Sequence, residues 1–253
     1  MRHTVRMVDQ RIAIGALVAS LLVPLTSCGG EDEQTLTVLA AASLTDVFED
    51  LATEFESAHQ GTTVQLSIGS STALAEQVAD GAPGDVLATA DETSMRLAED
   101  AGVTGAVSMF ATNVLTIVTP PGNPAGIESL DDLEGSTWVR CTDEAPCGRV
   151  ATALLADNDI TAEPASLEED VRATLDKVVS GEADAGLVYA TDAVAAADSV
   201  VAVEIPGAEA ALTSYFTTVL EQSESAELAQ EWFDFVTSDE GQAILEQAGF
   251  GAP

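Results

Sequence analysis

Apolar and polar positions follow two different periods along the chain, and this pattern predicts a succession of strands and helices. Residues 36–42 form a short apolar run that is typical of a buried strand. From residue 44 to residue 55 the apolar positions recur at helical spacing, which predicts an amphipathic helix. An alternating stretch at 64–68 predicts a second strand, and another helical pattern follows it. Two strand–helix units in succession favour an α/β fold with a mainly parallel sheet.

The same patterns continue to the end of the chain. Further strands are expected at 85–90, 113–119, 137–140, 185–189, 200–205 and 212–220. Helices are expected at 92–100, 129–135, 148–156, 168–179, 225–236 and 238–248. A small helix is expected after Asp192. The helix at 168–179 has acidic residues in its first turn and Lys177 in its last, an arrangement that the helix dipole favours.

Hydroxyl residues stand where the first two predicted strands pass into helices. Ser43 follows the first strand, and Gly69-Ser70-Ser71-Thr72 follows the second. Free backbone N–H groups and the positive end of the helix dipole meet at such a point, which makes it suitable for an anion. The alternative is that these serines only cap their helices. Helix starts near 147–148 and 170–171, together with the phenol of Tyr189, provide further neutral donors.

The charge balance excludes one class of partner and weakens another class of function. Asp and Glu number 43 against 8 Lys and Arg, which gives a net charge of −35, and 46% of the residues are apolar. Such a chain has no basic patch for nucleic acid, and its dispersed charge is that of a folded acidic protein. A serine hydrolase acting through Ser71 remains an alternative, but His59 is the only histidine after residue 3. We therefore expect a binding protein rather than an enzyme.

The first residues have the order of a secretory signal. Three arginines among the first 11 residues precede an apolar run at 12–22, which is shorter than the roughly 20 residues that span a bilayer. Leu25-Thr26-Ser27-Cys28 then resembles the cleavage site of bacterial lipoproteins, whose cysteine is lipidated. We expect a signal peptide at 1–27, a lipid on Cys28 and a polar tether at 28–34. The alternative is an ordinary signal with a chance cysteine.

Two more cysteines, Cys141 and Cys147, lie six residues apart. An isolated pair of cysteines in an exported chain indicates a disulfide. A metal site is the other interpretation, but a third soft ligand is missing from the sequence nearby.

Five motifs, taken in order, resemble those of the periplasmic molybdate-binding proteins (ModA) of ABC transporters. They are AAASLT at 40–45, GSSTALAEQ at 69–77, GAPGDV at 81–86, EDVR at 169–172 and GLVYATDA at 186–193. The resemblance covers residues 35 to 250. It implies a type II periplasmic-binding-protein fold with two α/β lobes, each a mainly parallel sheet flanked by helices, and the ligand in the cleft between them. Lobe 1 would comprise 35–112 and 214–253, and lobe 2 would comprise 113–213.

The resemblance also implies a function. A monomer on the outer face of the cytoplasmic membrane, lipid-anchored and without a cofactor, would capture molybdate or tungstate and deliver it to an ABC permease and its ATPase. Molybdenum would be bound only as the oxyanion, through neutral hydrogen bonds. Carried over by position, Ser43 and Ser71 would give hydroxyl and N–H donors, Cys147 and Val171 backbone N–H donors, and Tyr189 its phenol.

A site made only of donors suits a fully deprotonated oxyanion, because a protonated phosphate needs an acceptor for its proton. A receptor for sulfate or another oxyanion is the alternative within the same fold. Two positions depart from the family's pattern: Arg149 stands where an aromatic residue is frequent, and Phe216 where proline is common. Arg149 could approach the anion, and the alternative is a solvent-facing role.

Overall fold

The computed structural model describes residues 34–253, which belong to one compact unit. The predicted signal peptide and the lipidation of Cys28 lie outside the described residues. Gln34, assigned to the tether, already belongs to a strand, because its N–H donates to the carbonyl of Gly61 at 2.9 Å. None of the described helices is both long and apolar enough to cross a membrane.

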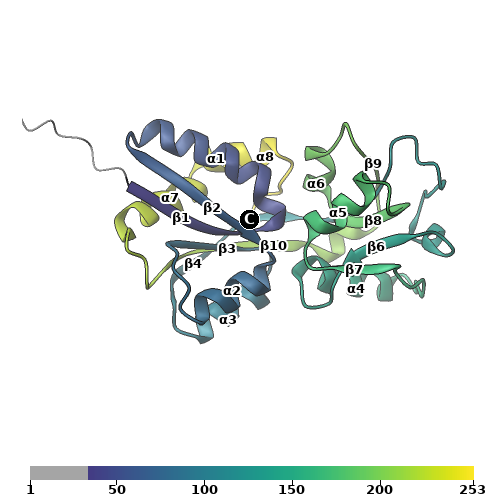
Figure 1. The fold of residues 1–253 in the computed structure, drawn as a ribbon, viewed down its shortest axis with the longest axis horizontal. Coiled ribbons are helices and arrows are strands. Elements are labelled where there is room, and N and C mark those ends of the chain that lie inside the picture. The colour runs from purple at the N-terminus through teal and green to yellow at the C-terminus, as the bar shows by residue number, and fades with distance from the viewer. Residues whose placement is uncertain (1–33) are drawn as a thin grey trace, which may run out of the picture. The chain divides into compact units, whose positions relative to one another are not determined.

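The first sheet combines strands from both ends of the described chain (Figure 1). Its strands are β1 (Gln34–Ala41), β2 (Thr62–Gly69), β3 (Val86–Thr89), β4 (Thr104–Asn113) and β10 (Thr213–Leu220). Their order is β2-β1-β3-β10-β4. β1 is parallel to β2 and β3, whereas β10 is antiparallel to β3 and β4. All strands but β10 therefore run in one direction.

The second sheet repeats this arrangement with strands from the middle of the chain. Its strands are β5 (Leu115–Thr119), β6 (Trp138–Cys141), β7 (Ser166–Glu168), β8 (Ala185–Tyr189) and β9 (Val201–Val203). Their order is β7-β6-β8-β5-β9, and here β5 is the antiparallel strand. The chain passes from one sheet to the other between β4 and β5 and returns between β9 and β10.

Helices flank both sheets, and we call each sheet with its helices a lobe. The first lobe contains α1 (Thr45–Ala58), α2 (Ser71–Ala79), α3 (Glu92–Asp100), α7 (Ala226–Thr237) and α8 (Asp239–Gln247). The second lobe contains α4 (Pro146–Asp157), α5 (Val171–Val179) and α6 (Ala190–Ala195). Short 3₁₀ turns are η1 (Ala42–Leu44), η2 (Leu130–Leu133) and η3 (Ala208–Ala211).

The side-chain alternation of β1 explains the two cores of the first lobe. Val38 belongs to the core shared with α1, α7 and α8, whereas its neighbour Leu39 belongs to the core shared with α2 and α3. Figure 1 shows these two groups of helices on opposite faces of the sheet. A separate core fills the second lobe around Trp138.

The structure corrects several sequence expectations. Two strands, β4 and β7, were not predicted, since β4 is only partly buried over most of its length and β7 has three residues. The helix expected at 168–179 begins at Val171, so Glu168 belongs to β7 and the helix has no acid in its first turn. The small helix expected after Asp192 is α6, which begins at Ala190.

Candidate ligand-binding site

A small cavity between the two lobes brings together all the residues that the sequence nominated as ligand donors. Those residues are Ser43, Ser71, Cys147, Val171 and Tyr189. The rest of its lining is Ala41, Ala42, Gly69, Ser70, Ala90, Ala145, Pro146 and Asp170. The volume of the cavity is about 10 Å³, roughly the space of one water. This space is far smaller than the clefts of about 300–1,000 Å³ that hold organic ligands.

Ser71 is buried at the start of α2 with its hydroxyl already engaged as an acceptor. Its Oγ accepts the backbone N–H of Ala90 at 2.9 Å. The N-cap of α2 is Ser70, and no side chain makes a capping bond there. Because the Ser71 oxygen accepts from Ala90, its own proton is available for an oxygen in the cavity. These contacts are not those of a helix cap, which was the alternative role of this serine.

Ser43 lies in η1 and not at the cap of α1, whose N-cap is Leu44. Its Oγ is 2.8 Å from the hydroxyl of Tyr215. Asn113 Nδ2 donates to the same Tyr215 hydroxyl at 3.4 Å. When Tyr215 accepts from Asn113 and donates to Ser43, the proton of Ser43 is directed elsewhere, and the cavity is beside it.

The sequence did not nominate Tyr215 or Asn113. They stand on β10 and at the end of β4, and 172 residues separate Tyr215 from the serine that it contacts. Both residues lie within strands expected at 113–119 and 212–220, but the local pattern does not show which strand residues face the ligand donors. Burial raises the pKa of the Tyr215 hydroxyl well above its ordinary value, so it remains a neutral partner.

The second lobe offers two backbone donors at helix starts. At α4, Pro146 has no N–H and the N–H of Gly148 donates to the carbonyl of Ala145 at 3.1 Å, so Cys147 keeps its N–H for the cavity. At α5, the Oδ1 of Asp170 accepts from the N–H groups of Arg172 and Ala173 at 2.9 and 3.0 Å.

The capping arrangement at α5 leaves the N–H of Val171 for the cavity, as the first turn of a helix has orphan donors. Asp170 itself also lines the cavity. The lining therefore includes one acidic residue besides the donors, and its Oδ1 is engaged in the cap of α5.

The disulfide expected from the sequence is present between Cys141 and Cys147. It joins the end of β6 to the first turn of α4. The loop that presents the Cys147 N–H is thus closed covalently at both ends, which restricts the positions that this donor can take.

Tyr189 ends β8 and supplies the phenol of the site. The residue is 1% exposed, and among the described residues its hydroxyl has no hydrogen-bond partner. Burial raises the pKa of this hydroxyl above its ordinary value, against a smaller opposite effect of the Thr213 hydroxyl, so it stays a neutral donor. A buried hydroxyl without a partner is unfavourable, and an oxyanion in the cavity would supply the missing acceptor.

This arrangement gives a test in which two measurements change in different ways. Tyr189→Phe should weaken oxyanion binding about tenfold, because one hydrogen bond to a charged ligand is lost. The same substitution should leave the stability of the ligand-free protein unchanged or raise it, since an unsatisfied buried hydroxyl disappears. Calorimetric titration and denaturant unfolding measure the two quantities. A large loss of ligand-free stability would show that the hydroxyl has a structural partner.

Asp192 is a buried carboxyl that contacts the backbone of the same tyrosine. Its Oδ2 accepts the N–H of Tyr189 at 3.1 Å, and its Oδ1 is 3.5 Å from Arg172 Nη1. Burial raises the pKa of Asp192 to about 7, although the charge of Arg172 acts in the opposite direction. The folded protein therefore keeps this proton to higher pH than the unfolded chain does.

A pH dependence of stability follows from Asp192. Because its pKa is raised on folding from a usual value of about 3.9, the free energy of unfolding should fall as pH rises from about 4 to about 7. Asp192→Asn should flatten this dependence. Urea unfolding at pH 5 and pH 8 measures the free energy of unfolding of both proteins. The same change in this free energy between the two pH values in both proteins would contradict these statements. Carboxyls whose pKa is lowered, such as Asp143, act below this window.

The structure does not place Arg149 in the lining of the cavity. Its guanidinium instead pairs with Asp91 of the first lobe, at 2.6 Å. The other departure, Phe216, lies where the pairing of β10 with β4 is irregular, between Tyr215 and Phe216. Within residues 34–253, no cluster of three or more His, Cys, Asp or Glu side chains is arranged to hold a metal ion.

Residues 36–251 match the family described as bacterial extracellular solute-binding protein. The chain belongs to this family, and the predicted α/β fold with two lobes is confirmed.

Individual members of this class are also similar to the chain. The chain is 34% identical over 256 residues to the molybdate-binding protein ModA of Mycobacterium tuberculosis, covering 96% of this chain and 98% of the relative. This confirms the family resemblance. The structure of the Azotobacter vinelandii periplasmic molybdate-binding protein matches with a TM-score of 0.76 at 22% identity, over 86% of this chain and 99% of that one. The structure of the M. tuberculosis sulfate-binding protein SubI matches with a TM-score of 0.75 at 22% identity, over 86% of this chain and 86% of that one.

Proposed function

We propose that this protein captures molybdate, and with it tungstate, outside the cytoplasmic membrane and delivers the ion to an ABC importer. The observation that carries the proposal is the convergence of neutral donors from both lobes on one small cavity. The similarity to molybdate-binding proteins over nearly the whole chain supports the choice of ligand.

Binding would work through oriented dipoles instead of a counter-charge. The cavity lining contains no Lys or Arg, and three of its five donors stand at the starts of α2, α4 and α5, where backbone N–H groups are unpaired. Hydroxyls and N–H groups aimed at an oxyanion form short charge-assisted hydrogen bonds. Because Ser43 and Ser71 come from one lobe and Cys147, Val171 and Tyr189 from the other, a bound anion would hold the lobes together.

The domain assignment remains part of this proposal: lobe 1 at 35–112 and 214–253, and lobe 2 at 113–213. The two crossings between the sheets would serve as the hinge. We also propose that a lipid on Cys28 anchors the protein to the outer face of the cytoplasmic membrane. It would act as a monomer without a cofactor, passing the oxyanion to a permease and its ATPase.

An enzymatic role for Ser71 has little support in the geometry. His59 follows α1 and does not line the cavity; its Nδ1 is 2.8 Å from the carbonyl of Phe55 and its Nε2 is 3.3 Å from Glu231. Ser71 therefore has no histidine base beside it, as a hydrolase of the Ser-His type requires. A serine-reactive phosphonate should leave this protein unlabelled.

Calorimetric titration with molybdate, tungstate, sulfate and phosphate tests the proposal. We expect tight binding of molybdate and tungstate and much weaker binding of the other two. Sulfate bound as tightly as molybdate would favour the second candidate, a sulfate receptor, which the structural similarity to SubI makes the one to exclude. Phosphate is included because the lining contains one acidic residue, Asp170. The absence of molybdate binding would overturn the proposal.

A further inference from the structure

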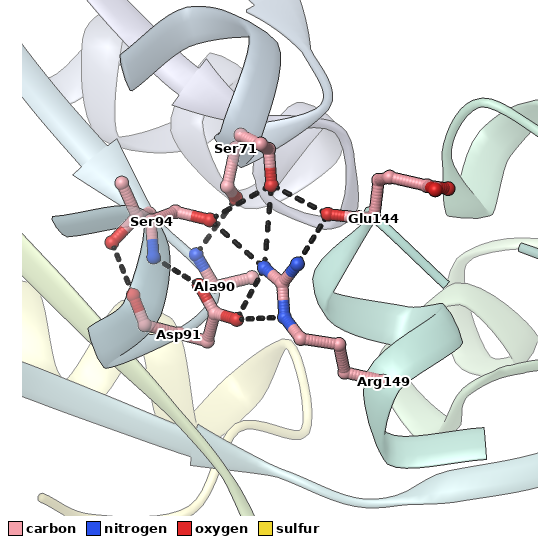
Figure 2. Close-up of polar contacts among 8 residues, drawn as sticks. Ser71, Ala90, Asp91, Ser94, Glu144 and Arg149 are labelled. Atoms are coloured by element: carbon pink, nitrogen blue, oxygen red, sulfur yellow. Dashed lines mark hydrogen bonds and ion pairs between the residues drawn. The ribbon is translucent and has the colours of Figure 1, made fainter. Parts of the chain in front are cut away.

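Arg149 crosses from the second lobe to the first beside the cavity (Figure 2). Its Nε and Nη2 both donate to Asp91 Oδ2, at 2.8 and 2.6 Å. Nη2 also reaches the hydroxyls of Thr72 and Ser94, at 3.2 and 3.1 Å. On its own lobe, Nη1 donates to the backbone carbonyl of Glu144. The guanidinium is thus held from both sides of the cleft.

Asp91 is fixed in position by a second task. As the N-cap of α3, it accepts the N–H of Ser94 on Oδ1 at 2.9 Å, while Oδ2 faces Arg149. The side chains of Arg149 and Asp91 are 29% and 18% exposed. A partly buried pair with a prepositioned acceptor contributes more than a mobile pair at the surface.

The residues that hold Arg149 are also connected to the ligand donors. Ala90, which precedes Asp91, donates its N–H to the hydroxyl oxygen of Ser71 at 2.9 Å. Thr72, which follows Ser71, donates its hydroxyl proton to the Glu144 carbonyl at 2.7 Å across the cleft. Figure 2 shows Ser71, Ala90 and Asp91 grouped around the guanidinium. Closure at Arg149 and placement of the Ser71 donor are therefore parts of one network.

The charge of the two lobes gives this crossing its importance. Residues 34–113 and 213–253 carry 20 acidic residues and one basic, and residues 114–212 carry 19 acidic and four basic. Two bodies of the same sign repel when they close, although salt screens the effect beyond about 10 Å. An arginine of one lobe seated on a carboxylate of the other acts against this repulsion at the edge of the cavity.

We propose that Arg149 is a positioning residue that, through its pair with Asp91, holds the lobes closed over the bound oxyanion and so slows its release. Neither residue of the pair lines the cavity. Its effect is on the lifetime of the closed state, and hence on the dissociation rate more than on the association rate. This inference rests on the proposed function.

Stopped-flow kinetics with molybdate on the purified full-length protein tests the inference with two substitutions of opposite charge. Arg149→Gln and Asp91→Asn both break the pair, and asparagine keeps the cap of α3. We expect each to raise the dissociation rate about tenfold with little change in the association rate. The double variant should be no worse than either single one, as for two partners of one interaction. Arg149→Lys should have a dissociation rate between those of the wild type and Arg149→Gln.

If only the charge of these residues mattered, the two substitutions would change the affinity for the anion in opposite directions. If Arg149 acted only by its field on the dianion, Arg149→Gln would weaken binding and Asp91→Asn would strengthen it, and that result would overturn the proposal. Arg96→Gln is the matched control, because Arg96 pairs within α3 with Glu92 at 2.6 Å and crosses no cleft. It should leave the dissociation rate unchanged.

A ligand-free measurement separates this inference from the proposed function. Spin labels placed on exposed positions of the two lobes report their separation in the absence of any oxyanion. Both Arg149→Gln and Asp91→Asn should shift the distances towards longer values, whichever ligand the site takes. Wild-type distances and wild-type release in both variants would overturn the role of Arg149, whereas a failure of the wild type to bind molybdate would overturn only the ligand.

Discussion

Ser71→Ala should weaken molybdate binding by about 2–3 kcal/mol, because the dianion loses a charge-assisted hydrogen bond in a site without a cation. The ligand-free protein should also lose about 1–3 kcal/mol of stability, since the buried N–H of Ala90 loses its acceptor. One hydroxyl thus has two partners, and the substitution removes both. Calorimetric titration and denaturant unfolding measure the two losses separately.

Ser43→Ala is the matched comparison for this result. The Ser43 hydroxyl contacts the side chain of Tyr215 and holds no backbone N–H, and Tyr215 keeps its contact with Asn113. Binding should fall while stability changes little. If Ser71→Ala reduced stability but left the affinity for molybdate unchanged, Ser71 would be a structural support for Ala90 and not a ligand donor.

The donors of the site could be nominated from the sequence because their position follows from local rules. Ser71 and Val171 stand where a strand or loop passes into a helix, and a helix start has free N–H groups whatever packs around it. The strands and helices that carry them also follow from periodicity in short windows. The family resemblance then related these separate helix starts to one cleft.

The parts that support the donors could not be predicted in this way. Tyr215 contacts Ser43 across 172 residues of sequence, and Asp91 contacts Arg149 across 58. Such contacts depend on how the lobes and strands pack, which no local period reveals. Arg149 was noticed as a departure from a pattern, but its partner Asp91 was not, and neither a place beside the anion nor a solvent-facing role describes the pair that it forms. The disulfide was inferred from two cysteines close in sequence, where the choice of partner was small.

Gly148 shows how tightly the donor loop of the second lobe is built. It is buried in the first turn of α4, and a Cβ at this position would overlap the carbonyl group of Thr142 and crowd that of Cys141. The Thr142 carbonyl accepts the N–H of Ala145 at 3.1 Å, and the Thr142 N–H donates to Glu168 at 2.8 Å. These are backbone groups in a loop that the disulfide closes, so the clash has no flexible side chain to relieve it.

Gly148→Ala should therefore destabilise the protein by about 1–3 kcal/mol through overpacking. It should also weaken molybdate binding at least about tenfold, because moving the start of α4 takes the Cys147 N–H away from the anion. Unfolding and titration of the same variant measure both effects. Gly69→Ala is the control for stability, since its Cβ would meet only the Leu74 side chain, at 3.7 Å. Binding at wild-type affinity by a destabilised Gly148→Ala protein would remove Cys147 from the ligand donors, because the loop would then have moved without effect on the anion.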